Sequence, residues 1–164
     1  MSTITIVTAD YHNPLHAQAV VNLLDAYASD PAGGGEPLSA HTRAHLVAAL
    51  AQRPQAFSVL ALDGATPVGL VNAIEGFSTF KCQPLVNVHD VAVLPGYRGQ
   101  RIAERMLAHV EALARRRGAC KLTLEVLSGN APALRLYERL GFADYQLDPA
   151  MGHARFMQKW LADA

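Results

Sequence analysis

The sequence predicts an α/β protein built around a mixed β-sheet. Strand-like and helix-like segments alternate along the chain, two neighbouring strand-like runs are typical of a hairpin, and a strand–helix–strand unit follows them. Hairpins supply antiparallel strand pairs, whereas a strand–helix–strand crossover supplies a parallel pair. The 164 residues, 51% of them hydrophobic, suit a single domain over residues 1–164 with a buried core.

The first elements are marked by β-branched residues and by a helix-start signal. Residues 3–9 (TITIVTA) predict a strand, and Asn13 followed by Pro14 is typical of a helix N-terminus. The apolar residues at helical spacing that follow are Val20, Leu23, Leu24 and Tyr27. Three glycines and two prolines interrupt the pattern at 29–39, before a second helix that ends near Gln52.

The remaining elements follow from the same local signals. The predicted strands are 57–62, 67–77, 84–94, 120–127 and 154–160, and the predicted helices are 99–117 and 130–142. Gly118 suits the position just past the end of the helix over 99–117. The strand at 84–94, the helix after it and the strand at 120–127 form the parallel crossover.

Charge and composition exclude several classes of partner. Fourteen basic and fourteen acidic residues cancel, so no overall field steers the chain to nucleic acid or to an anionic membrane. Arg115, Arg116 and Arg117 suit a helix C-terminus, and no aromatic platform accompanies them. No apolar run approaches the ~18 residues that span a bilayer. With only Cys82 and Cys120, we expect free thiols and a cytoplasmic protein that binds neither nucleic acid nor membrane.

A basic turn with two glycines follows the strand at 84–94. Glycine lets a ligand approach the backbone closely, and Arg98 and Arg101 add positive charge. The first amides of a helix lack intrahelical partners and attract phosphate. The turn therefore fits a pyrophosphate cradle, although an ordinary strand-to-helix turn with solvated arginines explains the same residues. It has neither a Walker loop nor a full dinucleotide fingerprint.

Two motifs in the second half resemble the GNAT superfamily of acetyl-coenzyme A dependent N-acetyltransferases. The first, Q/R-x-x-G-x-G/A, corresponds to Arg98, Gly99, Gln100, Arg101, Ile102 and Ala103. The second, N-x-x-A-x-x-L-Y-x-x-x-G-F, is matched by Asn130, Ala133, Leu136, Tyr137, Gly141 and Phe142. The resemblance covers residues 57–142 and implies a GNAT-like mixed central β-sheet with a splayed parallel strand pair, flanked by about four helices.

Arg101 departs from the family pattern, because it occupies a usual glycine position of this motif. Two alternatives stay open. A positive φ there costs a non-glycine residue roughly 1–2 kcal/mol. A helical φ carries no penalty and leaves the guanidinium to reach cofactor phosphates or solvent.

The resemblance implies that acetyl-CoA is the cosubstrate and that no metal takes part. By that resemblance Val91, Ala92 and Val93 pair with the pantetheine arm as an added strand would, and residues 98–103 bind the phosphates. Asn130 would lie beside the pantetheine, and it also makes a good helix N-cap. Tyr137 would lie near the leaving sulfur as a hydrogen-bond donor; packing under its helix is the alternative.

The acceptor must lose a proton before it attacks, since an alkylamine has a pKa near ~10.4. Strict alternation along 84–94 predicts one face with Asn87, His89, Val91 and Val93 and the opposite face with Val88 and Asp90. Some GNAT enzymes carry a glutamate base at the position of Asn87, and the arylalkylamine branch uses histidines on this strand. His89 is therefore the first candidate base and Glu75 the second; a structural histidine and a solvated glutamate are the alternatives.

The resemblance implies an N-acetyltransferase that moves the acetyl group of acetyl-CoA to a primary amine by direct nucleophilic attack. A small-molecule amine and a protein N-terminal amine both fit as acceptors. A non-catalytic acyl-CoA binding or sensing module with the same fold is the alternative. The segment 29–39 would be a lid over the acceptor groove or a plain connector, and homodimers are common in the superfamily.

Overall fold

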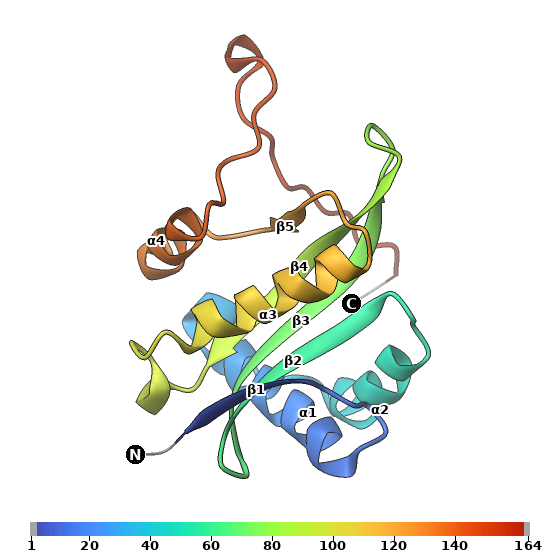
Figure 1. The fold of residues 1–164 in the computed structure, drawn as a ribbon, viewed down its shortest axis with the longest axis vertical. Coiled ribbons are helices and arrows are strands. Elements are labelled where there is room, and N and C mark those ends of the chain that lie inside the picture. Colours follow the sequence, from blue (N-terminus) through green and yellow to red (C-terminus); the bar gives the residue numbers. More distant parts are fainter. Residues whose placement is uncertain (1–2, 163–164) are drawn as a thin grey trace. The chain divides into compact units, whose positions relative to one another are not determined.

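The computed structural model describes residues 3–162 and divides into two compact units (Figure 1). The first unit ends at Leu124 and the second begins at Glu125. The first unit holds the sheet and three of the four α-helices, and the second holds the remaining helix. The single domain expected over residues 1–164 stays a prediction.

The first unit contains a mixed sheet, as predicted, and the sheet has five strands. Its strands, in spatial order, are β1 (Ile4–Thr8), β2 (Ala56–Asp63), β3 (Thr66–Ser78), β4 (Gln83–Val93) and β5 (Leu122–Leu124). The pairs from β1 to β4 are antiparallel, and β4 and β5 are parallel. The strand expected at 120–127 is thus only three residues long within this sheet.

The four predicted helices are present, and two of them are shorter than the predicted ranges 99–117 and 130–142. They are α1 (Pro14–Ser29), α2 (Ala40–Ala51), α3 (Ile102–Arg116) and α4 (Ala131–Arg139). Asn13 caps α1 by accepting hydrogen bonds from the amides of Leu15 and His16. Gly118 adopts a positive φ of 74° just past α3, as predicted for this position.

Helices cover both faces of the sheet. On one face α3 packs over β1 to β4, with Ile102, Met106 and Val110 fully buried (Figure 1). On the other face α1 packs against Leu60 of β2 and Leu70 of β3. Burying such side chains contributes about 1.5–3 kcal/mol each. The sheet is therefore buried between helices on both faces, which fixes the position of β4.

In the second unit α4 is capped at both ends. Asn130 accepts a hydrogen bond from the amide of Ala133, and Gly141, at φ 91°, follows the last turn. The amide of Phe142 donates to the carbonyl of Tyr137, which completes a Schellman motif. Three of the motif residues thus set the ends of this short helix.

The prediction of a strand at 154–160 is wrong, because these residues have no regular structure. Phe156 and Trp160 are 80% and 74% exposed. The segment alternates poorly, since Phe156 and Met157 are adjacent, and a strand needs a partner edge before its propensity takes effect. No β-ladder pairs this segment with another described part of the chain.

Candidate functional site

The parallel pair parts halfway along β4. β5 pairs with β4 only from Val86 to Val88, whereas β4 continues to Val93. The amide of Leu94 donates to the carbonyl of Val68 on the β3 side, and successive peptide groups point to opposite edges of a strand. Val91 and Val93 therefore direct their backbone groups away from β3, and Ala92 directs its own toward β3.

The turn between β4 and α3 has an exposed backbone. Residues Pro95–Tyr97 form a 3-10 turn, and the following Gly99 has φ 77°. A Cβ at Gly99 would meet no atom within 4 Å, so the space beside this peptide is open. Because the first α3 amides have no carbonyl of their own helix to bond, the turn presents several N–H groups together. The geometry fits a phosphate-binding backbone.

Of the two backbone conformations considered for Arg101, the structure has the one with a positive φ. It is the N-cap of α3 with φ 58° and ψ 23°, in the left-handed region, and its side chain makes no capping hydrogen bond. A non-glycine residue in this region costs roughly 1–2 kcal/mol. The backbone thus keeps the conformation that a glycine would adopt freely, and the guanidinium lies at the exposed start of the helix.

Arg98 connects three parts of the first unit. Its Nε donates to the carbonyl of Val93 over 3.0 Å, and its Nη2 lies 3.3 Å from Oδ2 of Asp30. The Asp30 pKa is lowered, first by the backbone amide of Ala32 and then by Arg98. The guanidinium therefore spans the open end of β4 and the segment after α1.

That segment, 29–39, is folded. Asp30 accepts a hydrogen bond from the amide of Ala32, and the amide of Gly35 donates to the carbonyl of Ala28. A Cβ at Gly33 would lie 2.0 Å from the Tyr27 carbonyl oxygen, so only glycine fits there. The segment contains a 3-10 turn at Pro31–Gly33, and the amides of Gly35 and Glu36 bond it to the end of α1.

The face alternation predicted for β4 is wrong, because a β-bulge interrupts it at His89. Ala73 pairs with Val88 and Asn72 pairs with Asp90, so His89 has no opposing residue. Directly paired residues share a face. Val88, Val91 and Val93 therefore lie on the α3 side, together with the β3 residues that they pair with. Asn87 and Asp90 lie on the α1 side. His89 itself is exposed.

Glu75 lies on the α3 side and is engaged in an ion pair. Its Oε2 is 2.9 Å from Nη1 of Arg117, and the guanidinium lies 4.7 Å from the centre of the Phe57 ring. Both charged side chains are about one-quarter to one-third exposed. The contacts anchor the end of α3 to the sheet, which favours a structural role for this carboxylate.

A row of hydrogen-bonded polar side chains crosses the sheet on the α1 side. The Tyr11 hydroxyl is 2.8 Å from Oγ of Ser58, Ser58 donates to Oδ1 of Asn72 over 2.6 Å, and Asn72 donates to Oδ2 of Asp90 over 3.1 Å. Ser58 and Asn72 are the buried polar residues of the core. Burial raises the Asp90 pKa, while the Asn72 hydrogen bond and the His89 charge oppose that rise.

The end of α1 lies near the same carboxylate. Burial raises the Tyr27 pKa, and the negative charges of Asp90 and Asp30 raise it further. The phenol thus lies within electrostatic range of both carboxylates. Asn87, three residues before Asp90, donates to Oγ1 of Thr123 on β5 across the remaining parallel pair.

Asn130 and Tyr137 belong to the second unit. Oδ1 of Asn130 accepts from the Ala133 amide over 3.3 Å, which confirms the capping role expected from its residue type. The Tyr137 ring meets the Phe142 ring edge-on, with centroids 5.8 Å apart. Their roles toward the cosubstrate stay predictions.

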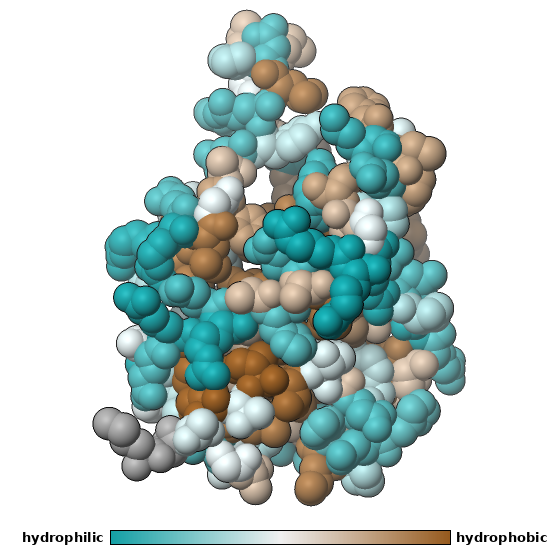
Figure 2. All heavy atoms as spheres, viewed as in Figure 1, coloured by the Kyte–Doolittle hydropathy of each residue, from teal (hydrophilic) through white to brown (hydrophobic). Residues whose placement is uncertain are grey.

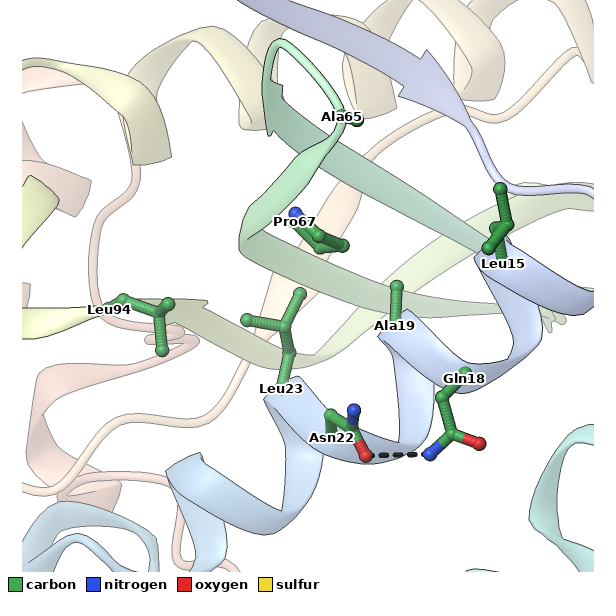
Figure 3. Close-up of a pocket in the computed structure, with 8 residues that line it drawn as sticks. All are labelled: Leu15, Gln18, Ala19, Asn22, Leu23, Ala65, Pro67 and Leu94. Carbon is green, nitrogen blue, oxygen red and sulfur yellow. Dashed lines mark hydrogen bonds between the residues drawn. The ribbon is translucent and has the colours of Figure 1, made fainter.

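A pocket of about 320 Å³ lies elsewhere in the first unit, between α1 and the β2–β3 turn (Figure 3). Gln18 donates to Asn22 at its rim, and Leu94 lies on its wall. Its lining residues are Leu15, Gln18, Ala19, Asn22, Leu23, Ala65, Pro67 and Leu94. None of them titrates and none is a predicted site residue, so this pocket is separate from the proposed chemistry.

One face of the structure shows a hydrophilic region over α3 (Figure 2). Hydrophilic side chains cover the C-terminal turns of α3, where Arg115 pairs with Glu111 (Figure 2). Within residues 3–162 no helix is both long and apolar enough to cross a bilayer. The same residues bring no three His, Cys, Asp or Glu side chains together as a metal site.

Comparison with known proteins defines the class. A crystal structure of a probable acetyltransferase superposes with a TM-score of 0.80 at 20% identity, over 97% of this chain and 99% of the other. The fold is thus that of known acetyltransferase structures. The sequence pattern of the acetyltransferase (GNAT) family matches residues 18–142, and the chain belongs to this family.

Curated relatives match parts of the chain. Streptothricin acetyltransferase of Streptomyces lavendulae is 44% identical over 66 residues, 40% of this chain and 35% of that protein. An N-alpha-acetyltransferase of Sulfurisphaera tokodaii is 35% identical over 98 residues, 56% of this chain and 59% of that protein. The matches thus span about a third to three-fifths of these relatives.

Proposed function

We propose that this protein is an N-acetyltransferase that transfers the acetyl group of acetyl-CoA to a primary amine by direct attack. The observation that carries the proposal is the edge of β4 at Val91 and Val93, which pairs with no strand and leads directly into the amides before α3; the Val93 carbonyl accepts from Arg98. An extended thioester carrier with phosphates at one end needs these two features in this order.

The residues of the first unit fit that carrier. The amide and carbonyl of Val91 supply strand-like hydrogen bonds for the pantetheine arm, and the backbone from Gly99 to Ala103 supplies donors for the phosphates. Arg98 and Arg101 add charge-assisted contacts. Because the acyl group arrives activated as a thioester, the proposed transfer needs no metal.

His89 stands first as the group that removes the proton of the amine. It is exposed at the bulge, immediately before the open part of β4, and an imidazole can accept and release a proton. Glu75 stands second, because its carboxylate is already paired with Arg117. Tyr137, by its place in the family motif, is proposed to donate a hydrogen bond to the leaving thiolate.

The names of the relatives indicate which amines to test. One relative is named for streptothricin and another for N-alpha acetylation, so both a small amine and a protein N-terminal amine belong in the panel. A binding module without turnover is the second candidate. The strained Arg101 and the amide Asn87, in place of a carboxylate, favour that candidate.

The test combines turnover with binding. Purified protein is incubated with acetyl-CoA and each amine, thiol release is followed, and CoA binding is measured by calorimetry. We expect thiol release only when an amine is present. His89→Gln should then lower the rate at least tenfold, and Glu75→Gln less, with CoA affinity unchanged.

The other outcomes separate the candidates. CoA binding without release for any amine favours the binding module. Thiol release that does not depend on the amine contradicts acetyl transfer, and absence of CoA binding overturns both candidates.

A further inference from the structure

The polar row on the α1 side has a direction. Ser58 donates to the carbonyl oxygen of the Asn72 side chain, so the Asn72 amino group is left to donate to Asp90. The Ser58 oxygen is then free to accept from the Tyr11 hydroxyl. Each donor therefore points along the row toward the carboxylate, and Asp90 must act as the acceptor at its end.

Asp90 occupies a special position in the sheet. It is the first paired residue past the bulge, two residues beyond Val88, where pairing with β5 stops. The next residue, Val91, presents its backbone at the open edge. A carboxylate on the α1 side thus lies one residue from the peptide group proposed to hold the thioester arm.

The carboxylate lacks a cation. Among the described residues, no lysine or arginine forms an ion pair with Asp90, and Asn72 supplies its one hydrogen bond, to Oδ2. The adjacent His89 and Tyr27 of α1 are the titratable groups that interact electrostatically with Asp90. A partly buried carboxylate with a spare oxygen is a receptor for a positively charged hydrogen-bond donor.

We propose that Asp90 binds the ammonium group of the acceptor amine, and that Asn72, Ser58 and Tyr11 hold it in place. This inference rests on the proposed acetyl transfer and names a residue that the reaction uses to select charged acceptors. Asp90 positions the amine beside the open edge of β4, and His89, at the bulge, takes the surplus proton.

Stability separates this role from a structural one. Because folding raises the Asp90 pKa, its contribution to stability is present below the unfolded pKa, about 3.9, and is lost as the pH rises through the folded pKa. At neutral pH the charge therefore opposes folding. Asp90→Asn, which still accepts from Asn72, should unfold at the same or a higher denaturant concentration.

The experiment measures binding apart from turnover. Hexylamine, a cation at pH 7, and 1-hexanol, its neutral analogue, are titrated into the CoA-saturated protein, and ligand-observed NMR gives the affinity. We expect wild type to bind hexylamine at least tenfold more tightly than Asp90→Asn does, from the strength of a charge-assisted hydrogen bond. The affinity for 1-hexanol should be equal in both proteins.

A second measurement uses wild type alone. The carboxyl carbon of Asp90 and the side-chain amide of Asn72 should shift on addition of hexylamine and stay in place with 1-hexanol. Ser58→Ala, which cuts the row one residue earlier, should weaken hexylamine binding less than Asp90→Asn does.

Each outcome decides the inference. Equal hexylamine affinity in wild type and Asp90→Asn, or no hexylamine binding by either, overturns it. Thiol release measured in parallel with acetyl-CoA in place of CoA, with hexylamine as acceptor, tests acetyl transfer itself: turnover with unchanged amine binding in Asp90→Asn removes only the role of Asp90. If hexylamine binding depends on charge but no turnover is seen, the amine site at Asp90 is supported and the proposed acetyl transfer is contradicted.

Discussion

Nη2 of Arg98 and Oδ2 of Asp30 lie 3.3 Å apart, although the two residues are 68 positions apart in the chain. The contact joins the basic turn before α3 to the folded segment after α1. Arg98 is also proposed to bind the cofactor phosphates, so Asp30 and the phosphates compete for one guanidinium. The contact therefore links the two sides of the proposed site in the first unit.

Asp30→Asn tests that competition. Asparagine can still accept from the Ala32 amide, so the turn keeps its cap while Arg98 loses its anionic partner. We expect CoA affinity, measured by calorimetry, to rise about two- to fivefold, the range of an exposed ion pair. Pantetheine, which lacks phosphates, is the control and should bind both proteins equally. A lower CoA affinity in the variant would contradict competition.

Arg101→Gly and Arg101→Ala separate backbone strain from charge. Glycine removes both the strain at φ 58° and the guanidinium, whereas alanine removes only the guanidinium. We expect the glycine variant to be more stable than the alanine variant by about 1 kcal/mol in urea unfolding. Both variants should bind CoA more weakly than wild type if the guanidinium contacts phosphate. Equal stability of the two would show that this position carries no strain.

Tyr137→Phe removes a hydroxyl and keeps the ring that packs edge-on against Phe142. If the phenol donates to the leaving thiolate, kcat should fall roughly 10- to 100-fold, with little change in the KM for acetyl-CoA. Thermal unfolding should stay within about 0.5 kcal/mol of wild type. An unchanged kcat would leave Tyr137 with a packing role alone.

His109 makes stability depend on pH. Its Nε2 lies 2.9 Å from Oγ1 of Thr8, and burial, followed by the charge of Arg116, lowers its pKa. A lowered histidine pKa favours the neutral form in the fold. Its stabilising contribution is therefore complete above the unfolded pKa, about 6.5, and is lost as the pH falls toward the folded pKa.

His109→Gln removes that titration and keeps a polar partner for Thr8. We expect the unfolding midpoint of wild type to decrease between pH 7 and pH 5 more steeply than that of the variant. Urea titrations across this range measure the difference, and identical slopes would assign the pH dependence to other groups.

Local signals in the sequence predicted most of the elements. The caps at Asn13 and Asn130 and the glycines after α3 and α4 act within a few residues, so they mark helix ends without knowledge of the fold. The five strands of the sheet were predicted from β-branched residues at 3–9 and from short apolar runs and a hairpin pattern further along the chain. The expected strand at 154–160 failed because strand formation also needs a partner.

The site was predicted less completely, because pairing decides which face a side chain occupies. Alternation along β4 assumed a regular ladder, and the bulge at His89 moved Asp90 to the face of Asn87 and away from Val88. The row from Tyr11 to Asp90 joins residues from three strands and a loop. The single available signal was an acidic residue inside an apolar strand.

By itself, the sequence determined the family, the order of the strands and α-helices as far as α4 and the basic turn before α3, since these depend on residue types at short spacing. Tertiary structure alone decided that Arg101 adopts a positive φ, that Arg98 meets Asp30 and that Asp90 ends a buried hydrogen-bonded row. Each of these depends on the register of neighbouring strands or on contacts between distant segments, which no local pattern of residues encodes.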